Sequence, residues 1–75
     1  MALLDVGRVV VKTRGRDAGF HGVVISKVEG GRVAVAGPNI REKTVSIHHV
    51  EPLPNKVDAS DATSAANALK SLGLN

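Results

Sequence analysis

Short runs of β-branched residues, separated by glycine, fill the first fifty positions of the chain. Runs of this kind are typical of β-strands. They predict strands over residues 6–13, 22–28, 32–36 and 44–47. The pair Gly30-Gly31, between two of these runs, indicates a tight hairpin turn. Gly37-Pro38-Asn39 then breaks the third run.

The pattern changes after these strands. Pro52 and Pro54 are expected to end the β region, because proline has no N–H to donate to a sheet. Small and apolar residues then recur at helical spacing: Ala62, Ala65, Ala66, Leu69 and Leu72. Asp58 or Ser60 can cap this helix, and Asp61 suits the positive end of its dipole. The apolar stripe is thin, so the helix needs a surface to pack against, either the β domain or a neighbouring protein.

These elements predict a mostly β fold, with a small barrel over residues 1–56 and a helical tail over residues 57–75. A barrel of short strands suits the strand spacing and leaves few open sheet edges. The 75 residues form one domain. A chain of this size buries only about 60% of its unfolded surface, so its core is thin. We therefore expect a protein that acts through its surface, with no deep pocket for a small-molecule substrate.

The residue inventory argues against catalysis, metal binding and cofactors. The chain has no cysteine, and neither a phosphate-binding loop motif nor a dinucleotide-binding glycine motif occurs in it. His48 and His49 are adjacent, so in an extended chain they point to opposite faces and cannot share one metal ion. A small secreted domain usually needs disulfide or metal staples, so the composition points to the cytoplasm. No apolar run approaches the ~20 residues that cross a bilayer.

Positive charge is concentrated in the predicted barrel. Net charge is +3 overall, and residues 1–56 hold nine of the ten Lys and Arg residues against five of the seven Asp and Glu residues. A small basic body of this kind favours a polyanionic partner. The tail holds one basic residue, Lys70, against Asp58 and Asp61. We expect the tail to serve packing and the barrel to bind RNA.

A first group of candidate RNA-binding residues runs from the first strand into the following loop: Arg8, Lys12, Arg14 and Arg16. Arg8 and Lys12 have the same parity, which places them on one face of the strand. Arg14 and Arg16 flank Gly15, where exposed backbone N–H groups can meet phosphate oxygens. For any one of these residues, the alternative is a solvated surface charge without a ligand. The cluster as a whole favours RNA binding.

A second candidate group lies further along the chain: Arg41, Lys43, His48 and His49, with His21 as an additional candidate. Arginine can bind phosphate with two parallel hydrogen bonds, and histidine can stack on a base or bond a 2′-hydroxyl. We expect at least one of the paired histidines to pack against the barrel. Phe20, the one aromatic residue, is expected to plug a barrel end. Without a stacking platform, the protein should read RNA shape and backbone instead of sequence.

The segment 11–24 resembles a KOW motif, in which two strands flank a loop with an obligatory glycine, here Gly19. Three further matches resemble the L-fourteen-e family of the archaeal and eukaryotic large ribosomal subunit: Val6-Gly7-Arg8, Gly37-Pro38 and His49-Val50-Glu51-Pro52. The resemblance covers about residues 3–57, and the short, near-neutral tail is similar to archaeal members. It implies an SH3-like barrel in the ribosome. Its implied partners are large-subunit ribosomal RNA and neighbouring ribosomal proteins, without catalysis, a cofactor or a membrane.

Four glycines are predicted to be structural: Gly15, Gly19, Gly30 and Gly31. Phe20 departs from the KOW pattern, which often has a basic residue at that position.

Two other functions remain open from the sequence. One is the KOW domain of a transcription elongation factor, which usually follows another domain. The other is an SH3-like protein-interaction module, although such modules line their groove with several aromatic residues.

Overall fold

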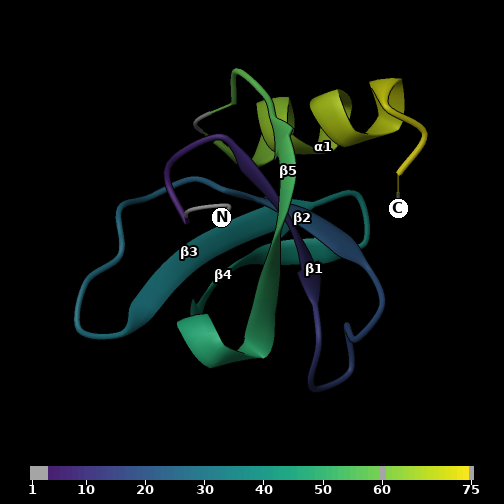
Figure 1. Ribbon diagram of the computed structural model, residues 1–75. Helices are drawn as coiled ribbons and strands as arrows, with labels where there is room; N and C mark the ends of the chain where they lie inside the picture. Colours follow the sequence, from purple (N-terminus) through teal and green to yellow (C-terminus); the bar gives the residue numbers. More distant parts are fainter. Residues whose placement is uncertain (1–3, 60, 75) are drawn as a thin grey trace.

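The computed structural model describes residues 4–59 and 61–74, and it consists of a curled sheet with one helix (Figure 1). Its elements are β1 (Arg8–Lys12), β2 (His21–Val24), β3 (Arg32–Gly37), β4 (Ile40–Ser46), the 3-10 helix η1 (Ile47–His49), β5 (Val50–Lys56) and α1 (Ala62–Ser71). The strands pair antiparallel in the order β4-β3-β2-β1-β5. The predicted small β-barrel with a short C-terminal helix is therefore confirmed.

The strand ends differ most from the predicted ones in β2 and β4. β4 begins at Ile40, earlier than predicted, because Gly37 and Ile40 already pair across a tight turn. β2 ends at Val24, earlier than predicted. Beyond it, the Ser26 hydroxyl oxygen accepts the Ala34 N–H at 3.0 Å. A side chain thus takes the place of the backbone acceptor that would have continued the sheet.

The expectation that two prolines end the β region is wrong. Pro52 and Pro54 lie inside β5, which within residues 4–59 and 61–74 is an edge strand paired only with β1. Proline is tolerated at an edge because one side of the strand needs no donor. The carbonyls of Leu53 and Pro54 accept hydrogen bonds from the Arg8 guanidinium at 3.3 and 3.2 Å. A side chain thereby satisfies part of this edge.

The sheet has apolar residues on both faces, which explains its continuous valine runs. Adjacent residues of a strand point to opposite faces, so Val9 and Val10 of β1 belong to different clusters. The cluster inside the barrel contains Val10, Val24, Val33, Val35, Ile40, Val45 and Val50. The cluster between the sheet and α1 contains Val9, Val23, Ala36, Ala59, Ala65 and Leu69. The helix is therefore part of the protein's own core.

Helix α1 begins at a different cap from those predicted. Its N-cap is Asp61, whose Oδ1 accepts the Ser64 N–H at 2.8 Å, while the Ser64 hydroxyl oxygen accepts the Asp61 N–H at 3.3 Å. This reciprocal pair is a capping box. Asp58 does not cap the helix, and Ser60 lies outside the described residues. Among the described residues, no helix has the length and apolar character needed to cross a membrane.

The tail packs on the barrel, which decides between the two possibilities left open by the sequence. Ala65 and Leu69 are fully buried against β2 and β3, and Figure 1 shows α1 lying across the sheet.

The four predicted structural glycines all have positive φ: Gly15 at 86°, Gly19 at 91°, Gly30 at 56° and Gly31 at 75°. Only glycine adopts these conformations without strain.

Candidate nucleic-acid interface

The loop between β1 and β2 carries two exposed arginines, Arg14 and Arg16. Backbone hydrogen bonds shape it: Gly19 N–H donates to the Lys12 carbonyl at 2.8 Å, and Lys12 N–H donates to the Phe20 carbonyl at 2.9 Å. The turn at Gly19 closes the loop on the end of β1. The arginine side chains are consequently presented from a loop with fixed ends.

The 3-10 helix η1 lies next to this loop. Thr13 N–H donates to the His49 carbonyl at 2.8 Å, and His48 N–H donates to the Ser46 hydroxyl at 3.2 Å. Both histidines are exposed, so the expectation that one of them packs against the barrel is wrong. Ile47 takes that place instead, packing on the barrel cluster. The histidines do not lie in an extended chain, because the backbone makes one helical turn here.

Strand β4 brings a second set of basic side chains beside the same loop. Arg41 and Lys43 are exposed, and the Lys43 Nζ donates a hydrogen bond to Asp17 Oδ2 of the loop. This hydrogen bond is the largest cause that lowers the pKa of Asp17. An open hollow of about 470 Å³ lies at this junction, lined by Arg16, Asp17, Asn39, Arg41, Glu42 and Lys43. The structure thus brings members of both predicted groups together.

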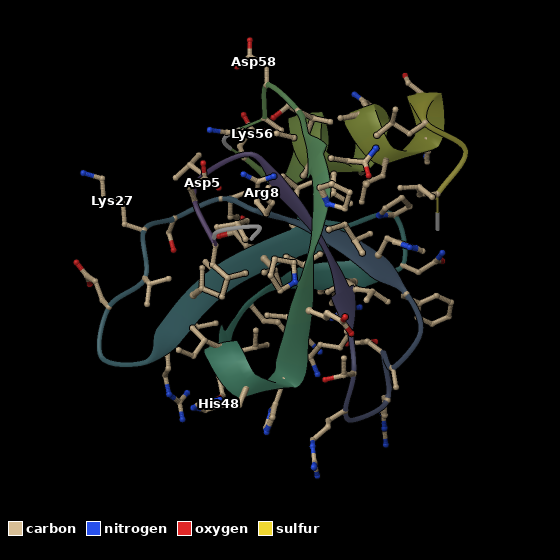
Figure 2. All side chains as sticks on the ribbon, in the orientation of Figure 1. Asp5, Arg8, Lys27, His48, Lys56 and Asp58 are labelled. Carbon is tan, nitrogen blue, oxygen red and sulfur yellow. The ribbon has the colours of Figure 1, made fainter. Side chains whose placement is uncertain are left out.

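Arg8 and Lys12 do not share this surface, contrary to the sequence expectation. Lys12 is only 6% exposed, and its Nζ donates to the carbonyl of Arg14. A buried ammonium group needs such a partner. Arg8 Nε binds Asp5 Oδ1 at 3.1 Å, and Figure 2 shows this pair near Lys56, far from His48. The β1–β5 pairing changes register between Arg8 and Val10, and the two side chains lie at opposite ends of β1.

Two further sequence expectations concern Phe20 and His21. Phe20 is 36% exposed, so it does not plug the barrel. Its N–H donates to the Asp17 carbonyl at 3.0 Å, which holds its backbone in the loop. His21 is half-buried at the start of β2. It contributes less accessible surface than the exposed histidines of η1.

Arg32 is an exposed basic residue that the sequence reasoning did not select. It opens β3 opposite Ser46, and the preceding Gly31 carbonyl accepts the Ile47 N–H at 3.0 Å. The hairpin therefore places Arg32 beside η1. The sequence signal for Arg32 was a cationic residue directly after a glycine turn.

We define the basic surface as Arg14, Arg16, Arg32, Arg41, Lys43, His48 and His49.

Comparison with known proteins places the chain in a family. No family model matches it. It is 39% identical over 74 residues to large ribosomal subunit protein eL14 of Pyrobaculum calidifontis, covering 93% of this chain and 72% of that protein. The eL14 of Aeropyrum pernix is also 39% identical, with 93% and 74% covered. The chain belongs to the eL14 family.

Membership in the eL14 family confirms the resemblance seen in the KOW-type loop and its flanking motifs. The eL14 of Hyperthermus butylicus is 33% identical over 76 residues, and the alignment covers 96% of this chain and 78% of that protein. All three relatives are archaeal, in agreement with the archaeal resemblance of the sequence. The family assignment favours the ribosomal interpretation over an elongation-factor domain or a protein-interaction module.

Proposed function

We propose that this protein is a structural component of the large ribosomal subunit and binds ribosomal RNA through the basic surface. The observation that carries the proposal is the convergence of exposed cations from the β1–β2 loop, β4 and the start of β3. The β1–β2 loop is joined to η1 by the hydrogen bond between Thr13 and His49 and to β4 by the contact between Lys43 and Asp17. The turn before β3 is joined to η1 by the hydrogen bond from Ile47 N–H to the Gly31 carbonyl. The eL14 relatives, named as large-subunit proteins, support the same partner.

The chemistry of this surface suits the RNA backbone. Arginine offers planar, paired donors that match phosphate oxygens, and exposed histidines can bond 2′-hydroxyls. Contacts to phosphate fix position and orientation, and each one releases condensed counterions. Binding is therefore electrostatic and depends strongly on salt. Phe20 is the single aromatic residue of the chain, too few for a platform that stacks successive bases.

Buried groups give the surface its shape in advance of binding. The Lys12 ammonium group holds the Arg14 carbonyl from inside the loop, so Arg14 starts from a restrained backbone. Preorganisation of this kind lowers the entropic cost of association. In this division of labour, residues 1–56 bind RNA. In the tail, Ala59, Ala65 and Leu69 complete the core, and the exposed side of α1 faces neighbouring ribosomal proteins.

Reassociation with the ribosome tests the proposal. Purified protein is mixed with archaeal large subunits that lack it, sedimented, and washed with moderate salt. We expect the wild-type protein and Lys27→Ala to sediment with the subunit. Lys27 is exposed and lies away from His48 in Figure 2. A variant with alanine at Arg14, Arg16 and Arg32 should be released. Retention of that variant at wild-type levels, or no sedimentation of the wild type, contradicts the proposal.

A further inference from the structure

The hollow between the β1–β2 loop and β4 has a composition that phosphate binding does not explain. Three of its six lining residues are cations, Arg16, Arg41 and Lys43, but two are carboxylates, Asp17 and Glu42. Carboxylates repel a phosphate group at short range. The hollow, at about 470 Å³, is also larger than one phosphate needs. Its lining offers hydrogen-bond acceptors as well as donors.

Asp17 is held as an ionised acceptor in this hollow. The hydrogen bond from Lys43 keeps its pKa below the ordinary value, so the carboxylate carries no proton to donate. Two carboxylate oxygens offer about four acceptor positions. Among residues 4–59 and 61–74, Lys43 is the one side chain that donates to Asp17. The Asp17 and Lys43 side chains are 20% and 40% exposed, so an incoming group can reach both.

The ion pair therefore presents a cationic donor next to an anionic acceptor. Among the four RNA bases, guanine has the matching Watson–Crick edge: the acceptor O6 beside two adjacent donors, N1–H and N2–H₂. Adenine and cytosine each pair one amino donor with a ring acceptor, and uracil has a single N–H between two carbonyls. Unpaired bases bound on this edge are the usual targets of sequence-specific RNA recognition.

We propose that this hollow binds one unpaired guanine of the RNA partner. Guanine N1–H and N2–H₂ donate to the Asp17 carboxylate, and O6 accepts from the Lys43 ammonium group. Arg16 and Arg41, at the same hollow, remain for the flanking phosphates. This inference rests on the proposed RNA-binding function, and it adds one base-reading position to a surface that otherwise reads backbone and shape.

Titration of the full chain with free nucleotides, followed by amide NMR, tests this assignment. The probes are guanosine 5′-monophosphate and adenosine 5′-monophosphate, which share phosphate and ribose and differ in the base. We expect guanosine monophosphate to shift the amides of Arg16, Asp17 and residues 39–43, and to bind at least about fivefold more tightly. A single well-matched base contact is worth ~1–3 kcal/mol, and the lower end of that range corresponds to about this ratio.

Two charge-matched variants separate base reading from electrostatics. Asp17→Asn and Glu42→Gln each remove one negative charge from the hollow. Asp17→Asn should abolish the preference for guanosine monophosphate. Glu42→Gln should strengthen the binding of both nucleotides by the same factor and keep the preference. Equal binding of both nucleotides to the wild type, or a preference that survives Asp17→Asn, overturns the inference. Salt-dependent binding of a ribosomal RNA fragment, measured in parallel, would still support the proposed function in that case.

Discussion

The backbones of Gly7 and Val57 are in direct contact. Val57 N–H donates to the Gly7 carbonyl at 2.8 Å. A Cβ atom placed on Gly7, whose φ is +93°, would lie 2.3 Å from the Val57 carbonyl oxygen. This contact joins the segment before β1 to the segment after β5. It therefore continues the pairing of β1 with β5 to the point where the chain leaves for α1, and it requires glycine.

Alanine at Gly7 should destabilise the fold far more than alanine at a glycine turn. The left-handed conformation costs about 1–2 kcal/mol for a residue with a side chain, and the collision with backbone adds to it. Gly30 is the matched control, with φ +56° but nothing within 4 Å of its added Cβ. We expect Gly30→Ala to lose about 1 kcal/mol and Gly7→Ala at least twice as much, as measured by chemical denaturation. Equal losses would contradict the close backbone contact between Gly7 and Val57.

The buried helix residue Leu69 should contribute strongly to stability. It is fully buried, whereas Leu72, three residues later, is 47% exposed. Removal of a buried leucine side chain costs about 2–5 kcal/mol. Leu69→Ala should therefore lower the free energy of unfolding by an amount in this range, and Leu72→Ala by less than about 1 kcal/mol. Similar effects of the two variants would show that α1 does not pack on the sheet in solution.

Acid should weaken the fold partly through Asp5. The Lys56 ammonium group, 2.6 Å from Asp5 Oδ2, is the largest cause that lowers the pKa of Asp5 to about 2. An unfolded aspartate titrates near pH ~3.9, so this contribution is present above pH ~4 and is lost as the pH falls towards 2. Denaturation curves at several pH values should show a shallower acid loss for Asp5→Asn.

Asp58→Asn provides the control for this titration. Asp58 is exposed and points away from the barrel in Figure 2, so its substitution removes the same charge without disturbing the Asp5 cluster. We expect Asp58→Asn to follow the wild-type acid dependence. The assignment to Asp5 fails if the Asp5→Asn protein loses stability between pH 4 and 2 as steeply as the wild type.

The fold followed largely from local patterns in the sequence. Alternating and continuous valines predicted the strands, and Gly30-Gly31 predicted the hairpin. The limits lay where tertiary context overrides a local rule. Pro52 and Pro54 were read as strand breakers, but an edge strand needs donors on one side only. Asp61 was assigned to the helix dipole, although its reciprocal hydrogen bonds with Ser64 make it the cap.

The candidate site was only partly readable from the sequence. Arg14, Arg16 and the η1 histidines were selected by charge and position, and the structure exposes them. Lys12 has the same charge, but the two-residue alternation of side chains along β1 places it inside the barrel. Its ammonium group donates a hydrogen bond to the Arg14 carbonyl there. Arg32 was missed because its proximity to η1 depends on pairing between β3 and β4. A local pattern shows the cation after the glycine turn, but it does not show which residues pair opposite it.

The central claim is that the basic surface binds RNA through its phosphates, and the salt dependence of affinity tests it most directly. Binding of a large-subunit ribosomal RNA fragment is measured at several salt concentrations for the wild type, Arg14→Ala and Lys27→Ala. The account predicts a linear fall of log K with log salt, a slope smaller by about 1 for Arg14→Ala, and a wild-type slope for Lys27→Ala. Affinity that is indifferent to salt, or an unchanged slope for Arg14→Ala, would contradict it.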